Sequence, residues 1–553
     1  MSKWSYLHCN SLAPNKYITL NDVIKRNAEK FPHTEAFIYR NEHGDRQSIT
    51  FGDLYEQGRC VAQYLVKSGV QRQDKIGLFG PNTLARIVAE CGILLAGAVV
   101  LHLNIDVQNG SDCKDVLEKA KCKVVFADLG VSDAFLPLIR SLIATDETNH
   151  KRQKLIFLRK PDSANVTDTL LNDIQTSGNY DLILPDVCPE DDAVIFTTSG
   201  STGKPKMVVH SHFAFTAAVG PIFDMAVKRK TSFNNRPFGY SGGSLAIATA
   251  LGCTRVFTDS ALGTIRNEMK IIWKIIAEEH VDIALLMPFS LYDLITIKDN
   301  IVDDGYRLDT ITTTGQVIDT FCARAIGRFC KSLRIGYGST ETIGVSALST
   351  SDDNLATGNV GKPHPGVEIR VVDEDGCVVP IGEEGTVQVR STFLMKRYFH
   401  DAEKTRDAFT KEIPGWFKME DIGLISASGD LIVRGRVKEN ISRGGRKILP
   451  GVIDDVVKQM EGISRVATVA VPDVRLYEEV CVCYVTEEGA ELLTSDVQLY
   501  CEDKFTNSEA GDGMGSMPKY FVMFDNFPVL YTGKVDKQTL KRQASDRLGL
   551  SSY

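Results

Sequence analysis

The chain has 553 residues, of which 43% are hydrophobic and 24% are charged, and its formal net charge is −8. This length exceeds what one hydrophobic core usually serves, so we expect at least two domains. The composition excludes a disordered or fibrous chain, and the acidic balance offers no broad basic field for a nucleic-acid backbone.

The sequence carries no signal for secretion or membrane insertion. Its start, MSKWSYLHCN, lacks the basic head and apolar stretch of a secretory signal. The most apolar run, residues 87–103, contains Glu90 and His102, so we expect a buried helix that leads into a strand and no transmembrane segment. The final Ser-Ser-Tyr is not an SKL-type peroxisomal address. We therefore expect a cytoplasmic protein.

The cysteines indicate reduced thiols. There are 13 of them, scattered and without a repeated CxxC pair, which argues against a disulfide framework or a thiolate metal site. Alternation within VCVCYV places Cys481 and Cys483 on one face of a strand, where we expect core packing.

The predicted elements define an α/β fold. From residue 74 to about 257, short β-branched runs alternate with stretches of helical spacing, as in a parallel sheet. Between residues 361 and 434, strand-like runs are separated by Gly-containing turns, which indicates an antiparallel β subdomain. A second short-period α/β segment follows. We predict a large N-terminal domain, residues 1–435, and a smaller C-terminal α+β domain, residues 436–553.

A Gly- and hydroxyl-rich loop follows the strand-like residues 193–196. Small residues let backbone N–H groups approach a polyphosphate, hydroxyls add donors, and lysine adds charge, so the composition predicts a phosphate cradle. Pro205 stands where a Walker loop would carry a magnesium-binding Ser or Thr. The candidate residues are Thr197, Thr198, Ser199, Gly200, Ser201, Thr202, Gly203 and Lys204.

Two histidines, His210 and His212, follow the loop and could suggest a metal pair. No further ligands are nearby in the sequence, so we expect structural roles. Further on, residues 337–341 read Tyr-Gly-Ser-Thr-Glu after another strand-like run. Thr340 can donate to a phosphate, and Glu341 offers the hard oxygen ligand that Mg²⁺ prefers.

These motifs, in this order, resemble those of the adenylate-forming superfamily, which includes acyl-CoA synthetases, coumarate-CoA ligases, beetle-type luciferases and peptide-synthetase adenylation domains. The resemblance covers nearly the whole chain. It implies an acid-thiol ligase of fatty acid or lipid metabolism, which uses ATP and Mg²⁺ to convert a carboxylic acid to an acyl-adenylate. Coenzyme A then accepts the acyl group.

The resemblance implies roles for residues of the large domain. The phosphate loop wraps the ATP phosphates, Tyr337 and the Gly315-Gln316 pair lie on the adenine side, Thr340 touches the α-phosphate and Glu341 holds magnesium. Asp421 accepts hydrogen bonds from the ribose, although Met419 and Glu420 replace the Thr-Gly that usually precedes it. Tyr240 falls where many relatives carry a gate to the acyl tunnel, and core packing is an equal alternative for it.

The resemblance also implies that the C-terminal domain, residues 436–553, is a mobile lid, and it implies roles for residues in and near this domain. Arg436 contacts the ribose or phosphate, Lys438 is the hinge, and the Gly444-Gly445 backbone lies along the pantetheine arm of coenzyme A. Lys534, in the terminal Gly-Lys-Val-Asp segment, is the predicted catalytic cation, because an ammonium beside the α-phosphate neutralises charge as pyrophosphate leaves.

Two alternatives remain open at this point. A luciferase-type oxygenase would make the same adenylate and pass it to oxygen. A pseudoenzyme would bind nucleotide without turnover, a reading that only Met419 and Glu420 favour. Whether the acid is fatty or aryl is also open, since pocket residues come from scattered positions.

Overall fold

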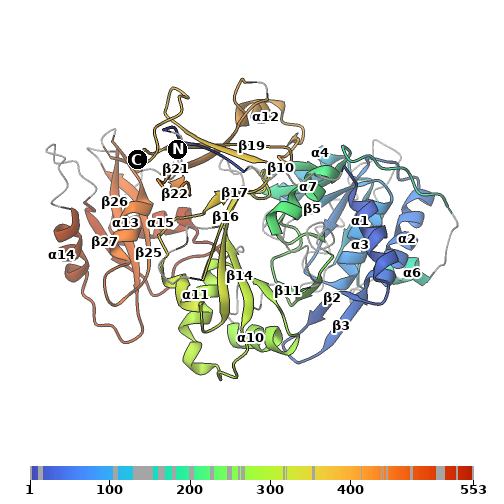
Figure 1. The fold of residues 1–553 in the computed structure, drawn as a ribbon, viewed down its shortest axis with the longest axis horizontal. Coiled ribbons are helices and arrows are strands. Elements are labelled where there is room, and N and C mark those ends of the chain that lie inside the picture. Colours follow the sequence, from blue (N-terminus) through green and yellow to red (C-terminus); the bar gives the residue numbers. More distant parts are fainter. Residues whose placement is uncertain are drawn as a thin grey trace.

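The protein is described from a computed structural model, in which the described strands form four sheets (Figure 1). The described residues are 3–9, 17–103, 110–128, 154–159, 169–176, 182–198, 205–223, 230–245, 252–259, 262, 268–315, 318, 320–351, 355–412, 414–436, 439, 441–443, 446–473, 477–505, 517–530 and 533–550.

The first sheet has eight strands, which are parallel from β9 to β8 and antiparallel where β10 joins β9 and β20 joins β10. Helices α1 (Leu20–Lys30), α2 (Phe51–Lys67) and α3 (Leu84–Leu95) lie together beside it (Figure 1). In spatial order the strands are β20 (Arg397–Tyr398), β10 (Lys206–Ser211), β9 (Asp192–Thr198), β5 (Val99–Leu103), β4 (Lys75–Phe79), β6 (Val124–Ala127), β7 (Lys154–Phe157) and β8 (Thr169–Leu170).

The apolar run at residues 87–103 is confirmed as buried helix followed by strand. Helix α3 and strand β5 supply it, and nearly every side chain in it is buried. Within the described part of the chain, no helix has the length and hydrophobicity needed to span a bilayer.

The second sheet has nine strands and is parallel from β14 through β2. Helices α10 (Met269–Glu278) and α11 (Pro288–Thr296) lie against it (Figure 1). In spatial order the strands are β17 (Lys362–Pro363), β16 (Ser346–Thr350), β15 (Cys330–Tyr337), β14 (Leu308–Thr314), β13 (Ile283–Leu285), β11 (Thr231–Asn234), β12 (Thr254–Phe257), β2 (Glu35–Arg40) and β3 (Arg46–Thr50).

Helix α7 (His212–Phe223) joins these two layers. Its Ala214 and Ala218 belong to the same buried cluster as Phe233 of the nine-stranded sheet. Its Phe215 belongs to the cluster beneath the eight-stranded sheet. The helix is therefore apolar on two faces, as a helix covered from both sides must be.

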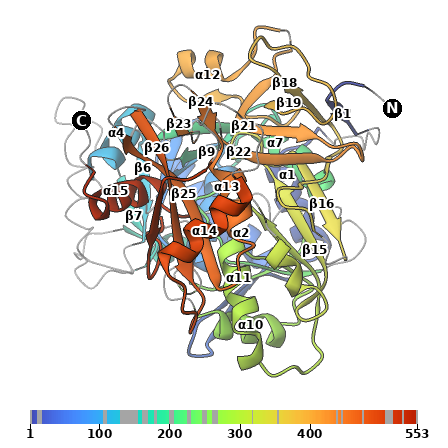
Figure 2. The ribbon, with the colours of Figure 1, turned by 90° about the vertical axis from the view of Figure 1, so that its left-hand side faces the viewer.

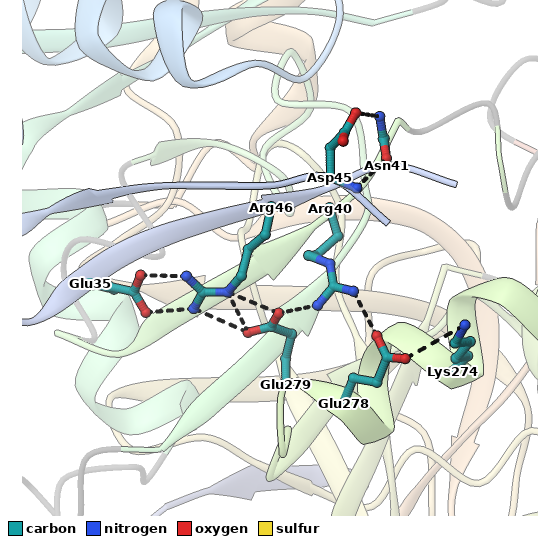
Figure 3. Close-up of polar contacts among 8 residues, drawn as sticks. All are labelled: Glu35, Arg40, Asn41, Asp45, Arg46, Lys274, Glu278 and Glu279. Carbon is teal, nitrogen blue, oxygen red and sulfur yellow. Dashed lines mark hydrogen bonds and ion pairs between the residues drawn. The ribbon is translucent and has the colours of Figure 1, made fainter. Parts of the chain in front are cut away.

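An ion-pair network fastens the β2–β3 hairpin to the end of α10 (Figure 3). Arg46 forms a bidentate ion pair with Glu35, in which both N···O distances are 2.7 Å, and it also pairs with Glu279. Arg40 pairs with Glu279 and Glu278. Glu279 is the shared, largely buried carboxylate, so two guanidinium groups compensate one desolvated charge.

The third sheet is the antiparallel subdomain predicted for residues 361–434. Its order is β1 (Tyr6–His8), β18 (Val367–Val372), β19 (Gly385–Ser391), β21 (Phe417–Ile425) and β22 (Leu431–Arg436), with α12 (Ala402–Ala408) outside it (Figure 2). Strand β1 is an addition that the sequence did not indicate: three residues from the start of the chain extend the edge next to β18.

The C-terminal residues form a fourth sheet in the order β24 (Arg446–Ile448), β23 (Ile441–Arg443), β26 (Tyr477–Thr486) and β25 (Ile463–Asp473), with β27 (Tyr520–Met523) parallel to β26. Helices α13 (Pro450–Val457), α14 (Thr494–Phe505) and α15 (Lys537–Arg547) accompany it. Cys481 and Cys483 are fully buried in its core, which confirms their expected packing. Strand β22 ends at Arg436, where we predicted the domain boundary. That boundary stays a prediction.

Candidate active site

The candidate site begins where two parallel strands end side by side. In β14 and β15, Thr314 is paired with Gly336. Gly315 therefore follows one strand as residues 338–341 follow its neighbour. Ligands of open α/β sheets bind outside the carboxyl ends of the strands, so these residues occupy the expected edge.

The predicted ribose residue Asp421 is tied to two other predicted site residues. The Tyr337 hydroxyl donates to its Oδ2 at 2.5 Å, and the Arg436 Nε lies 3.3 Å from its Oδ1. Asp421 and Arg436 are direct partners across β21 and β22. Burial raises the pKa of Asp421, while Tyr337 and Arg436 act in the opposite direction. Burial and the neighbouring carboxylate also hold the pKa of Tyr337 well above its usual value.

The two unusual residues before Asp421 do not face the same way. Met419 is buried and belongs to the main hydrophobic cluster. Glu420 is exposed and has φ +59°, a left-handed conformation that glycine adopts without strain. Met419 therefore contributes to packing, and Glu420 holds a backbone shape that suits the glycine it replaces.

The Thr340-Glu341 pair is held by residues far away in sequence. The His210 ring donates from Nε2 to the Thr340 carbonyl at 2.7 Å, and the Tyr398 hydroxyl donates to the Glu341 Oε1 at 2.8 Å. Burial lowers the pKa of His210 to about 4, so its ring is neutral near pH 7 and carries one N–H. Sequence reasoning missed Tyr398, because nothing in the spacing links it to Glu341.

The second histidine of the suspected metal pair also has a structural contact. His212 is buried, and its Nδ1 accepts from the Leu20 backbone N–H at 3.3 Å. Across the described residues, no group of three or more His, Cys, Asp or Glu is arranged to hold a metal ion. Both His210 and His212 thus have hydrogen bonds to the backbone of other segments, as expected for structural residues.

The phosphate loop connects β9 to β10, which pair antiparallel with Thr198 opposite Lys206. The Thr197 hydroxyl donates to the His102 carbonyl at 3.1 Å, so it ties β9 to β5. The Lys206 ammonium lies 5.1 Å from the centroid of the Tyr398 ring. The strand that follows the loop, β10, therefore lies next to β20, whose Tyr398 holds Glu341.

Several predicted site residues lie outside the described residues. These are Ser199, Gly200, Ser201, Thr202, Gly203, Lys204, Gln316, Lys438, Gly444 and Gly445. The roles assigned to them stay predictions.

Lys534 comes from the C-terminal part of the chain and lies at the end of β14. Gly315 has φ +91°, and a Cβ on it would sit 3.8 Å from both the Cε and Nζ of Lys534. On the neighbouring Gly533, a Cβ would collide with the ring of Phe289 in α11, so glycine permits this close approach. Burial, with Arg236 and Arg436 nearby, lowers the pKa of Lys534 to about 8.

The segment around the predicted acyl gate is also ordered around a cation. The Arg236 guanidinium lies 5.6 Å from the centroid of the Tyr240 ring. Arg236 directly precedes the segment 237–243 that drew attention to Tyr240, and its charge was the available signal, which sequence reasoning passed over.

The chemistry of the site suits a phosphate ester and a metal held with it. Lys534 and Arg436 supply positive charge beside Asp421, and Glu341 offers a carboxylate oxygen. Mg²⁺ is usually bound by one or two carboxylates together with substrate phosphates and water. With no three-ligand group in the described part of the chain, Glu341 fits that mode and does not fit an all-protein metal cage.

Comparisons with known proteins agree with this geometry. The family described as "AMP-binding enzyme" matches residues 24–399. The chain is 27% identical to medium-chain acyl-CoA ligase ACSF2, mitochondrial, of Danio rerio, over 99% of this chain and 91% of that protein. It is 24% identical to long-chain-fatty-acid–CoA ligase FadD13 of Mycobacterium tuberculosis, over 95% and 98%. The crystal structure of the anthranilate CoA ligase AuaEII in complex with anthranoyl-AMP has a TM-score of 0.80 at 20% identity, over 97% and 98%.

Proposed function

Because the chain belongs to the family of AMP-binding enzymes, we propose that it is an acid-thiol ligase, which activates a carboxylic acid with ATP and transfers the acyl group to coenzyme A. Relatives along nearly the whole chain carry the names of acyl-CoA ligases, which supports the thiol as acceptor. The observation that carries the proposal is the approach of Lys534, from the C-terminal sheet, to Gly315 and to the Asp421 cluster.

In the first half-reaction, the substrate carboxylate attacks the α-phosphorus of ATP and pyrophosphate leaves. Asp421 accepts hydrogen bonds from the ribose, and Tyr337 and Arg436 orient its carboxylate. Thr340 donates to the α-phosphate from a backbone that His210 holds in place. Lys534 stabilises the negative charge that grows on the transferring phosphate. Positioning and charge stabilisation are sufficient for this chemistry, so no protein nucleophile is required.

Magnesium is the proposed metal, and Glu341 is its protein ligand. The ion would neutralise charge on the phosphates of ATP and help pyrophosphate to depart. The Tyr398 hydrogen bond orients the Glu341 carboxylate and leaves its second oxygen to bind the metal.

In the second half-reaction, the thiol of coenzyme A attacks the acyl carbon and AMP leaves. Lys534 occupies the site during adenylation, whereas the predicted pantetheine surface at residues 444–445 belongs to the same C-terminal domain. One domain cannot present both parts to one site at the same time, so we propose a large domain at 1–435 and a lid at 436–553 that rotates about Lys438.

The test uses a panel of aliphatic and aromatic carboxylic acids and measures pyrophosphate release with and without coenzyme A. Lys534→Ala should reduce adenylation by about a hundredfold to a thousandfold, the usual cost of losing one such contact. It should spare thioester formation from supplied acyl-AMP.

The matched control is Lys504→Ala, because Lys504 lies on α14 and its contacts among the described residues are with Asp503 and Tyr500. If none of the acids supports pyrophosphate release, the ligase function would be excluded and a nucleotide-binding pseudoenzyme favoured. Light emission from a luciferin adenylate would favour the oxygenase.

The proposed partners are small molecules, namely a carboxylic acid and coenzyme A, and no nucleic acid. We also propose a cytoplasmic location. Imaging of the tagged full-length chain tests it, with mitochondria as the contrary outcome, since the ACSF2 relatives are named as mitochondrial.

A further inference from the structure

The side chain of Arg236 is a cation for which the described residues supply no anionic partner. Its Nη1 donates to the Met287 sulfur, a weak acceptor, and its Nε is buried without a hydrogen-bond partner. Among the described residues, no carboxylate lies within ion-pair distance of it. Burial lowers the pKa of Arg236, and within the described part of the chain the Tyr240 hydroxyl opposes that shift. The residue as a whole is half-buried, but its Nε is buried without a hydrogen-bond partner, which is costly, so a structural role does not account for this side chain.

The neighbours of Arg236 place it between the acyl gate and the reacting end of the site. On one side are the Tyr240 ring and Gly242, where a Cβ would sit 3.6 Å from the Arg236 Cδ and Nε. On the other side is Met287, whose methyl carbon is 3.2 Å from the Cβ position of Gly315, the residue that Lys534 touches. A single methionine thioether thus bridges Arg236 to the place where Lys534 acts.

A fully buried arginine on strand β12, Arg255, shows what a structural role looks like beside the same loop. Arg255 donates to the carbonyls of Asn234 and Gly243, and it lies over the Phe238 ring. Asn82 adds bonds to the Arg236 carbonyl and the Phe238 N–H. These contacts fix the backbone of residues 234–243. They consume the donors of Arg255 and leave those of Arg236 for another group.

We propose that Arg236 binds a second carboxylate on the acyl substrate, so that the preferred acid is a short dicarboxylic acid. This inference rests on the proposed function. One carboxylate reacts beside Lys534, and the other pairs with Arg236 about one methionine side chain away. A guanidinium and a carboxylate form charge-assisted bonds that are strongest in a water-poor site. A monocarboxylic acid would leave the cation unpaired, and sites built for a polar group strongly reject analogues that lack it.

The first experiment compares matched acids with the wild-type protein by pyrophosphate release: succinate against butyrate, and glutarate against valerate. Each pair has the same carbon number and differs in the second carboxylate. We expect kcat/KM for the dicarboxylate to exceed that of its partner by at least about a hundredfold. A preference for the monocarboxylates would overturn the inference and leave the ligase function standing. The absence of pyrophosphate release with every acid would overturn the proposed function itself.

The second experiment uses Arg236→Met, which keeps the length of the side chain and removes its charge. We expect kcat/KM for the dicarboxylate to fall about a hundredfold, while the value for the monocarboxylate holds or rises and the KM for ATP is unchanged. Arg236→Lys should restore part of the dicarboxylate activity. Equal losses with both acids, together with a raised KM for ATP, would assign Arg236 to the nucleotide and overturn the inference. Arg59→Met is the control, because Arg59 lies on α2 and pairs with the exposed Glu56.

Discussion

At the scale of single residues, Lys534 combines a positive charge with a buried place, and this sets a pH limit on adenylation. Burial lowers its pKa to about 8, and only the protonated form stabilises the developing phosphate charge. We expect kcat/KM for pyrophosphate release to fall as the pH rises through about 8, since that ratio reports the free enzyme.

The fall should be weaker in kcat, because bound ATP adds negative charge beside Lys534 and raises its pKa. In Lys534→Arg, kcat/KM should no longer fall below pH 10, whatever the effect of the substitution on the rate, because arginine stays protonated there. A flat kcat/KM profile between pH 7 and 9.5 in the wild-type protein would contradict the assignment.

The backbone at Glu420 gives a stability prediction. A non-glycine residue at φ +59° carries strain, so Glu420→Gly should raise the free energy of unfolding by about 1 kcal/mol. Urea denaturation measures it. Glu403→Gly, at an exposed position of helix α12, should do the opposite and cost about 1 kcal/mol. Equal signs for the two variants would show that the φ angle of Glu420 is not a source of strain.

The residues that sequence reasoning found lie within short contiguous motifs, and those it missed do not. Tyr337, Asp421, Arg436 and Lys534 do converge in the structure. The residues that hold Thr340 and Glu341 in place could not be predicted from the sequence. Tyr398 is 57 positions from Glu341, and His210 is 130 positions from Thr340. Chain spacing carries no information about such contacts until the sheet order is known.

At the scale of elements, helix α11 lies beside the C-terminal sheet (Figure 2). The Tyr292 hydroxyl donates to the Ser464 carbonyl on β25 at 2.6 Å. Next to it, burial raises the pKa of Asp293 to about 6, although Arg465 of the same strand opposes the shift. The contact therefore contains a carboxyl that is easier to bury when protonated.

The sign of the pH effect follows from this raised pKa. The docked state binds the proton of Asp293 more tightly than a solvated carboxyl does, so docking is favoured as pH falls through about 6 and weakened above it. Asp293→Asn removes the charge and should strengthen docking at pH 8 but change little at pH 5.

Hydrogen exchange of the peptides covering residues 288–296 and 463–473 measures this docking. Higher protection of Asp293→Asn than of wild type at pH 8, with near equality at pH 5, is the expected outcome. Asp299→Asn serves as the control, because that neighbouring residue is exposed. Identical differences at both pH values would show that Asp293 does not titrate with docking.

Sequence periodicity predicted the type of most elements but not their partners. The alternating α/β region and the antiparallel run at 361–434 both appear as expected. Strand β1 escaped prediction because three residues are too short for a periodic signal, and it is a strand only through its pairing with β18.

At the scale of the whole molecule, the structure has Lys534 beside Gly315, which is the arrangement that the proposed adenylation step needs. Proline fixes φ near −65°, so Lys438→Pro should restrict the rotation that the second half-reaction requires. We expect a first turnover of pyrophosphate release to persist while acyl transfer to coenzyme A becomes slow. Single-turnover assays of each half separate the two effects.

A control for the proline itself is available in the same domain. Glu488 precedes Gly489, which has φ +82°, in an exposed turn closed by the Ala490 N–H and the Glu487 carbonyl. Proline is well accepted at that turn position, so Glu488→Pro should leave both half-reactions unchanged. Equal slowing of the two halves by Lys438→Pro would remove the support for a hinge there.

The place of the β2–β3 hairpin has a consequence for how the protein is made. The hairpin, residues 35–50, is synthesised well before its sheet partner β12, which begins at Thr254, and before its ion-pair partners Glu278 and Glu279. At about 5–20 residues per second, the β2 edge of the nascent hairpin waits on the order of ten seconds or more for β12. Arg40 on β2 keeps that edge charged, which discourages pairing with other nascent chains.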